Sequence, residues 1–273
     1  MGTNLKNLPR ICNASNMYED GLHHLSMFEG GYINFGYWDH VKSDNGILTK
    51  SQRIESEKNL YRFVGKRMRL GNRDKVLELG CGLGLGTVFL YENYYIDEII
   101  GVDFSENQIA RAMELHSDLL AHSKKVVFQK GDAQSLEFED ESFSKVISIE
   151  AAQHFESFEL FANESYRVLK KDGLLGIATF FGKGAEGFSE ACSLIPTIEN
   201  GTDKLYMVSD IEKILYNAGF KDVEIISIGK NVWDYLDRWI SQGSLKDSWD
   251  RNWLLGYKKQ IFDYYVLLAK KPI

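Results

Sequence analysis

Short apolar runs rich in β-branched residues recur along the chain from about residue 74, and longer segments with helical spacing separate them. This alternation is typical of βαβ units, so it predicts an α/β fold built on a mostly parallel sheet. The last run, which is rich in aromatic and aliphatic residues, is predicted to form a final strand. The predicted strands cover residues 75–79, 98–102, 125–129, 145–149, 174–180, 223–228 and 261–272.

Polar residues and a glycine mark the expected ends of helices. Ser105 followed by Gln108, and Ser209 followed by Glu212, have the spacing of a capping box. In that motif the first side chain accepts a hydrogen bond from the backbone of the residue three positions later. Gly219 is predicted to end a helix just before a strand.

Three segments do not follow the alternation of strands and helices. We predict that residues 1–48 form an N-terminal helical and aromatic cap, and that residues 49–273 form the main domain. Within that domain, lid insertions are expected at about 181–207 and 230–260. The second insertion is dense in tryptophan and tyrosine. It fits either a lid over a pocket or a packed helical hairpin, and the sequence leaves both open.

Composition and charge narrow the possible partners. A chain of 273 residues is long enough for one sizeable α/β domain. The net charge of −7 and the scattered basic residues disfavour nucleic acid. There is no unbroken apolar stretch of the roughly 18 residues that a membrane span needs, and no apolar signal region at the N-terminus. We therefore expect a cytoplasmic protein without a membrane span.

The cysteines and paired histidines do not suggest a metal site. Cys12, Cys81 and Cys192 are too far apart in sequence for a metal knuckle or a redox pair. His23 and His24 are adjacent, so on a helix their side chains would point about 100° apart. We expect no bound metal.

Residues 76–87 read VLELGCGLGLGT, a predicted strand that runs into closely spaced glycines. The spacing does not fit a dinucleotide fingerprint in any register, and no Gly-Lys-Ser/Thr follows to form a phosphate loop. What remains is Gly80, Gly82 and Gly84 at every second position, at the carboxyl end of the first strand. Ligands bind in the crevice at the carboxyl ends of such strands, and glycine lets the backbone approach them closely.

Two further strand ends carry suitable polar groups. Asp103 ends the second predicted strand, where its carboxylate could accept both hydroxyl hydrogens of a ribose diol. After the third strand, the Asp132 side chain and the Ala133 backbone N–H could recognise the edge of an adenine ring. Together these positions indicate an adenosine ligand with no accompanying phosphate site.

The motifs ELGCGLG, GVDFS, GDAQSLEF and SIEAAQHF resemble those of class I S-adenosylmethionine-dependent methyltransferases. The resemblance covers roughly residues 60–270, and NFGYWD, SYRVLKKDGLL and IATFF are similar to the small-molecule group of ubiquinone, tocopherol, sarcosine and natural-product tailoring enzymes. It implies a Rossmann-like, seven-stranded, mostly parallel sheet with an antiparallel last strand and helices on both faces. It also implies S-adenosyl-L-methionine as cofactor, S-adenosyl-L-homocysteine as product, a small-molecule acceptor, and a monomer or homodimer.

The resemblance also implies which residues contact the cofactor. The glycine loop would lie under the methionine part, Asp103 would hold the ribose, and Phe104 would stack on the adenine. The expected cofactor-binding residues are Tyr37, Gln52, Glu78, Gly80, Cys81, Gly82, Asp103, Phe104, Gln108, Asp132, Ala133, Ile149 and Glu150.

His154 is the expected catalytic residue, because an imidazole can take a proton from a hydroxyl at neutral pH. The first expectation is therefore methylation of an oxygen on an apolar or aromatic natural-product-like molecule. Methylation of nitrogen or carbon, or a non-catalytic S-adenosylmethionine-binding role, stays open, whereas the failed fingerprint disfavours a nicotinamide-dependent oxidoreductase. The expected substrate-binding residues are Tyr32, Gln153, Phe180, Trp233 and Trp239.

Overall fold

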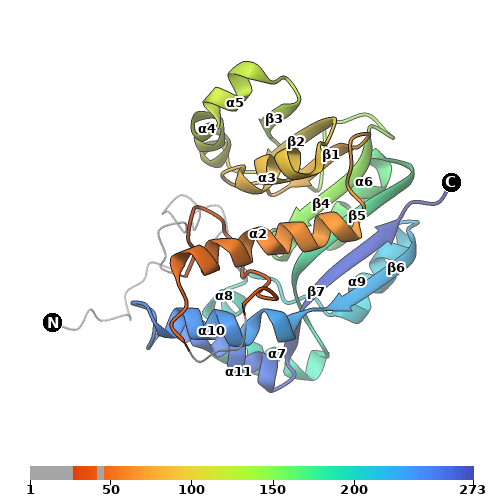
Figure 1. Ribbon diagram of the computed structural model, residues 1–273. Coiled ribbons are helices and arrows are strands. Elements are labelled where there is room, and N and C mark those ends of the chain that lie inside the picture. The colour runs from red at the N-terminus through yellow and green to blue at the C-terminus, as the bar shows by residue number, and fades with distance from the viewer. Residues whose placement is uncertain (1–26, 42–45) are drawn as a thin grey trace.

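The computed structural model describes residues 27–41 and 46–273, which form a seven-stranded sheet with helices on both faces (Figure 1). The strand order is β3-β2-β1-β4-β5-β7-β6, and β7 is antiparallel to both of its neighbours. The other adjacent pairs are parallel, which confirms the predicted Rossmann-like sheet with an antiparallel last strand. The strands are β1 (Lys75–Leu79), β2 (Glu98–Asp103), β3 (Val126–Lys130), β4 (Phe143–Ile149), β5 (Leu169–Gly182), β6 (Lys221–Ser227) and β7 (Phe262–Lys270).

The helices fill the intervals between the strands. The α-helices are α2 (Lys50–Arg67), α3 (Leu85–Tyr94), α4 (Glu106–Leu115), α5 (Ser117–His122), α6 (Phe158–Val168), α7 (Phe188–Leu194), α8 (Pro196–Glu199), α9 (Val208–Asn217), α10 (Trp233–Ser241) and α11 (Asn252–Lys258). The short 3-10 helices are η3 (Ala152–His154), η4 (Ala185–Gly187), η5 (Gly229–Asn231) and η6 (Trp249–Arg251).

One of the two predicted capping boxes is half formed and the other is wrong. The Ser105 side chain accepts a hydrogen bond from Gln108 N at the start of α4, but the buried Gln108 side chain has no hydrogen-bond partner among the described residues and returns none. Helix α9, however, begins at Val208 with Met207 as its N-cap residue, so Ser209 lies inside the first turn and does not cap it. Met207 pairs with Gly182 in an isolated bridge, and this long-range contact fixes where the helix begins.

Alternate residues of the strands point to opposite faces of the sheet, and each face has its own hydrophobic core. Val76 and Ile147 belong to the cluster that packs against α2, α3 and α4, whereas Leu77 and Val146 belong to the cluster that packs against α6 and α9. Figure 1 shows α2 lying across the front of the sheet. Because both faces are covered, the central strands β1, β2 and β4 are largely apolar and buried.

Helices from the two insertions pack together beside the start of β7. Helices α7 and α10 both contact α11, and Figure 1 shows the three gathered at the bottom of the view. Trp233 and Trp253 are buried and stack with ring centroids 5.7 Å apart and planes 9° apart. Residues 230–260 therefore form helices that pack through buried aromatic rings, and Trp249 and Trp253 of this segment also line a cavity described below.

The described part of the N-terminal segment, 27–41, forms turns and no helix or strand. Arg53 of α2 holds it in place, because its guanidinium donates to Met27 O at 2.9 Å and to Asn34 O at 2.6 Å. Arg53 is fully buried and forms an ion pair with Glu57, at 3.1 Å. The helical part expected of the predicted cap falls outside the described residues.

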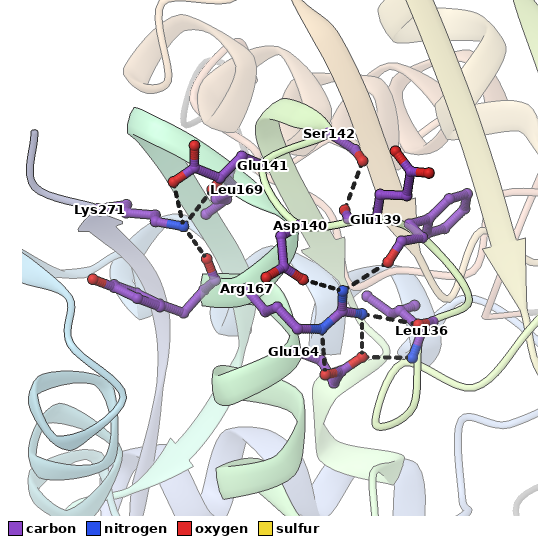
Figure 2. A network of polar contacts seen from close by, with 11 residues as sticks. Leu136, Glu139, Asp140, Glu141, Ser142, Glu164, Arg167, Leu169 and Lys271 are labelled. Carbon is purple, nitrogen blue, oxygen red and sulfur yellow. Dashed lines mark hydrogen bonds and ion pairs between the residues drawn. The ribbon is translucent and has the colours of Figure 1, made fainter.

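A second arginine fixes the loop between β3 and β4. Figure 2 shows the Arg167 guanidinium of α6 at the centre of a polar network that includes Leu136, Asp140 and Glu164. Arg167 pairs with both oxygens of Glu164, at 2.9 and 2.8 Å, and Glu164 also accepts from Leu136 N at 2.7 Å. The network therefore ties the loop that follows Asp132 to the helix behind the sheet.

Candidate functional site

A cavity of about 350 Å³ lies at the carboxyl ends of β1, β2 and β4. Its volume falls in the range of roughly 300–1,000 Å³ that is usual for small-molecule and cofactor sites. The residues that line it come from the N-terminal segment, the glycine loop and the ends of several strands. This is the edge of the sheet at which ligands of open α/β folds bind.

The glycine loop forms the floor of this cavity. Gly80 N and Cys81 N donate hydrogen bonds to Val102 O of β2 at 2.8 and 3.0 Å, which anchors the loop to the sheet. Gly80, Gly82 and Gly84 all have positive φ, a conformation that favours glycine. A Cβ on Gly82 would meet no atom within 4 Å, so this residue faces open space, whereas a Cβ on Gly80 would lie 2.2 Å from the Ala151 Cβ.

Asp103 lies beside this loop and lines the same cavity. Its Oδ2 accepts a hydrogen bond from Gly82 N at 2.9 Å, and its Oδ1 accepts one from Ser105 N at 2.9 Å. Burial raises the pKa of this carboxyl above its ordinary value, and the two backbone N–H groups oppose that shift. Each carboxylate oxygen has a second lone pair, so Asp103 can also accept hydroxyl groups from a bound ligand.

The far wall of the cavity carries the candidate adenine contacts. Asp132 and Ala133 line it, and Asp132 Oδ1 accepts a hydrogen bond from Gln134 N at 2.9 Å, which holds the turn. Phe104 also lines the cavity and keeps 64 % of its surface exposed. An exposed ring at the mouth of a cavity can stack on a planar ligand.

A second, smaller cavity of about 100 Å³ adjoins the first. Ile33, Glu150 and His154 line both cavities, so the two meet at these three residues. The predicted substrate contacts Gln153 and Phe180 line the smaller one. A ligand in each cavity could therefore approach the other beside His154.

The surroundings of His154 fix the orientation of its imidazole ring. Nδ1 lies 3.0 Å from Thr202 O and 3.4 Å from Asp203 Oδ1, and both oxygens are acceptors. Nδ1 therefore carries the proton in the neutral ring, and Nε2 is the basic nitrogen. The Nε2 atom lies 3.3 Å from Gln153 Nε2, an amide donor, which is consistent with this tautomer.

Glu150 ends β4 at the junction of the two cavities, with a positive φ of 53°. Its Oε1 accepts hydrogen bonds from Tyr264 Oη at 2.8 Å and from Phe35 N at 3.1 Å. Burial raises the pKa of Glu150 to about 8, although both donors oppose the shift. A positive charge in the adjoining cavity would favour the ionised form of this carboxyl.

Four of the residues expected to contact the cofactor do not line either cavity. Tyr37 packs on Phe63 instead, with ring centroids 4.7 Å apart. Gln52 closes the capping box of α2. Glu78 is buried beneath the glycine loop, where burial raises its pKa to about 7, and Gln108 is buried in α4.

Two predicted substrate contacts also lie elsewhere. Trp233 is part of the buried aromatic stack, and Trp239 packs in a separate cluster with Trp38 and Leu48. Trp249 and Trp253 of the same insertion line the smaller cavity instead. The aromatic density of this insertion pointed to the right segment, but the helix packing decided which rings reach the cavity.

Other residues of the site were not predicted from the sequence. Ile33 and Tyr61 line the larger cavity, and Asp203 and Asp250 line the smaller one. The two aspartates lie in insertions without a recognisable motif. Only the folded chain brings them into the lining of the same cavity as His154.

Within residues 27–41 and 46–273, no group of three or more His, Cys, Asp and Glu side chains is arranged to hold a metal ion. Cys81 is buried, and burial raises its pKa well above the ordinary value. Cys12, His23 and His24 lie outside the described residues. Over the same ranges, no helix has the length and apolar character that crossing a membrane requires.

Comparisons with known proteins show which proteins this chain resembles in sequence and in fold. Residues 77–177 match the sequence model of a methyltransferase domain. The chain is 27 % identical to the erythromycin 3''-O-methyltransferase of Saccharopolyspora erythraea over 91 % of this chain and 86 % of that protein. It is 33 % identical to the sterol 24-C-methyltransferase of Candida albicans over 58 % of this chain and 43 % of that protein.

Among solved structures, the fold is similar to geranyl diphosphate C-methyltransferase from Streptomyces coelicolor A3(2), crystallised with Mg²⁺, geranyl diphosphate and S-adenosyl-L-homocysteine. The TM-score is 0.77 at 12 % identity, with 97 % of this chain and 98 % of that chain covered. The matched domain, the glycine loop and the relatives show an S-adenosylmethionine-dependent methyltransferase, and the sheet order is that of the class I methyltransferase fold.

Proposed function

We propose that the enzyme methylates a hydroxyl oxygen of a small, largely apolar or aromatic, natural-product-like acceptor, with His154 as general base. The observation that carries this proposal is the position of His154 where the two cavities meet, with Asp203 beside its Nδ1. The likeness to an O-methyltransferase over most of both chains supports oxygen as the acceptor atom.

The larger cavity is the proposed cofactor site. Its residues fit S-adenosylmethionine, because Gly82 presents bare backbone to open space and Asp103 has acceptor capacity for a ribose diol. Phe104, Asp132 and Ala133 would contact the adenine. When bound, the cofactor supplies a methyl group that its sulfonium makes electrophilic. Ile149 and Glu150 would lie near that positive charge.

The smaller cavity is the proposed acceptor site. Phe180 and Trp253 give it apolar walls, and Gln153 gives it an amide that is fixed by Thr179 Oγ1 at 2.7 Å. Tyr32 and Ile33 of the N-terminal segment line the cofactor side. These walls would hold the acceptor oxygen in line with the methyl group, and such alignment provides much of the rate enhancement.

His154 would remove the hydroxyl proton as the oxygen–methyl bond forms. Thr202 O and Asp203 keep the Nδ1–H tautomer, so Nε2 takes the proton. The ring then becomes an imidazolium, and the Asp203 carboxylate at 3.4 Å stabilises it. Histidine and aspartate have the same roles in a catalytic triad, where the histidine takes the proton and the aspartate stabilises the imidazolium. Asp203 is thus a positioning residue that acts through His154.

The test is transfer of a labelled methyl group to a panel of hydroxylated aromatic and alicyclic acceptors. We expect His154→Ala to lower kcat by roughly 10²–10⁴-fold, the usual contribution of general base catalysis. Asp203→Asn should cause a smaller loss of kcat. Both variants should bind S-adenosyl-L-homocysteine as the wild type does. Near-normal kcat in His154→Ala would contradict base catalysis there.

The likeness to a sterol C-methyltransferase keeps carbon methylation as the second candidate. The product decides between them, because the ¹³C chemical shift of a transferred ¹³C-methyl group differs for bonds to oxygen, nitrogen and carbon. Under the proposal the label appears on oxygen. If no acceptor is methylated by an enzyme that binds S-adenosyl-L-homocysteine, the non-catalytic alternative gains support.

A further inference from the structure

A glutamine in the far wall of the larger cavity joins two parts of that wall. Gln134 follows Asp132 and Ala133 in the turn after β3, and it lines the cavity with them. Its side-chain Oε1 accepts a hydrogen bond from Ser157 N at 2.7 Å, at the start of α6. Its Nε2 donates to Asp132 Oδ1 at 3.1 Å. Gln134 therefore links the candidate adenine contact to the helix that follows η3.

The orientation of the Gln134 amide follows from its two partners. A backbone N–H such as that of Ser157 can only donate, so Oε1 has to face it. The Nε2 group then faces the carboxylate of Asp132, which accepts. The reverse orientation would place a donor against a donor and an oxygen against an oxygen. The amide thus has one favourable arrangement, and the backbone of α6 holds it there.

The Asp132 carboxylate is held at one oxygen and open at the other. Oδ1 accepts from the backbone N of Gln134 at 2.9 Å as well as from its side-chain Nε2. Among the described residues no donor reaches Oδ2, and this oxygen is not buried. The two donors from Gln134 together fix the plane of the carboxylate, and Oδ2 keeps its capacity to accept from a bound molecule.

We propose that Gln134 is a positioning residue for recognition of the cofactor, and that it acts by holding the Asp132 carboxylate towards the 6-amino group of adenine. The inference rests on the proposed function, because it takes the larger cavity as the S-adenosylmethionine site. The amino group donates to Asp132 Oδ2 in this arrangement. A charge-assisted hydrogen bond is strong, but it weakens steeply when its geometry is poor. The preference of the enzyme for adenine over the same purine without its amino group should therefore depend on Gln134.

The test titrates two probes into the enzyme by calorimetry, S-adenosyl-L-homocysteine and its 6-deamino analogue, in which purine replaces adenine. The ratio of the two dissociation constants isolates the amino group, because the probes are otherwise the same. We expect the wild type to bind S-adenosyl-L-homocysteine at least tenfold more tightly. In Gln134→Met, which has a similar length and cannot donate, that ratio should fall at least threefold. Gln260→Met is the matched control, because it removes an exposed glutamine whose Nε2 donates to Tyr257 O, and it should keep the wild-type ratio.

Further variants show whether Gln134 acts through Asp132. Asp132→Ala should lower the ratio at least threefold, and adding Gln134→Met to it should then change the ratio by less than twofold. Gln134→Glu keeps an acceptor for Ser157 N but places a second carboxylate beside Asp132. It should therefore lower the ratio at least threefold, and it serves as the test if Gln134→Met does not fold. Each variant keeps the bond from Arg167 to Leu136 O that holds the following loop.

The proposal is overturned if the wild-type ratio is below tenfold, or if the ratio falls less than threefold in a folded Gln134 variant. A further change of more than twofold when Gln134→Met is added to Asp132→Ala also overturns it. If Asp132→Ala keeps the wild-type ratio, the adenine does not contact Asp132, so the proposed cofactor placement fails as well. If Asp132→Ala lowers the ratio and the Gln134 variants do not, only the role of Gln134 is wrong. None of these measurements depends on which acceptor atom receives the methyl group.

Discussion

Gly80 and Gly82 of the glycine loop should respond differently to replacement by alanine. Gly82 has a φ of +51°, and an added Cβ would meet no atom within 4 Å. Gly82→Ala should therefore lower the free energy of unfolding only by the left-handed backbone cost, about 1–2 kcal/mol. In the proposed cofactor site, the new methyl would instead occupy space that the cofactor would cover. Crowding there should weaken S-adenosyl-L-homocysteine binding at least tenfold, or by about 1.4 kcal/mol.

Gly80→Ala should show the opposite balance. Gly80 has a φ of +81°, and a Cβ there would lie 2.2 Å from the Ala151 Cβ. Carbon atoms normally pack at about 3.5–4.0 Å, so η3 and the loop would have to separate. Overpacking of about 1–3 kcal/mol adds to the backbone cost, which gives a total of about 2–5 kcal/mol. This variant should lose more stability than Gly82→Ala.

Urea denaturation of the ligand-free variants measures the free energies of unfolding, and calorimetric titration of S-adenosyl-L-homocysteine measures the dissociation constants. Wild-type affinity in Gly82→Ala would show that the cofactor does not lie over this residue. Equal losses of stability in the two variants would show that the Gly80–Ala151 contact is not the constraint described. Either result would refute the argument from the loop geometry.

Two buried ionisable groups give further predictions. The pKa of Glu78 is raised from 4.5 to about 7, so the native state keeps a proton that the unfolded chain loses. Glu78 should then contribute a fall of up to about 3 kcal/mol in the free energy of unfolding between pH 4.5 and 7. In urea titrations at several pH values, the total fall should be smaller by about that amount in Glu78→Gln. Arg53→Met should cost about 3–5 kcal/mol, because it leaves the buried Glu57 carboxyl without its ion-pair partner, and Arg53→Met combined with Glu57→Gln should recover part of that loss in the same assay.

The strands were predictable because their pattern is local. Each is a short apolar run bounded by polar residues, and β1 has the predicted bounds of 75–79. Strand β5 begins earlier than predicted, at Leu169, because Leu169 pairs with Phe143 of β4; the register then shifts over the polar residues that precede Leu174. The beginning of α9 was predicted incorrectly for a related reason, since a bridge between Met207 and Gly182 fixes it.

Part of the site was predictable for the same reason. Gly82, Asp103 and Asp132 follow successive strands, and the carboxyl ends of parallel neighbours meet at one edge of a sheet, so their proximity follows from strand order. His154 follows β4 at that same edge. The positions of Tyr37 and Trp239 did not follow from strand order. Each is an aromatic residue whose partners come from distant segments.

The sequence by itself determined the strands and the glycine loop, because hydrophobic period and turn chemistry act between near neighbours in the chain. The antiparallel direction of the last strand was expected only from the resemblance to a known family. Only the tertiary structure decided the acceptor side. Asp203 and Asp250 lie in separate insertions, and they line the same cavity only because α7, α10 and α11 pack together beside β7. Such packing depends on the fit of many distant side chains, which no local pattern encodes.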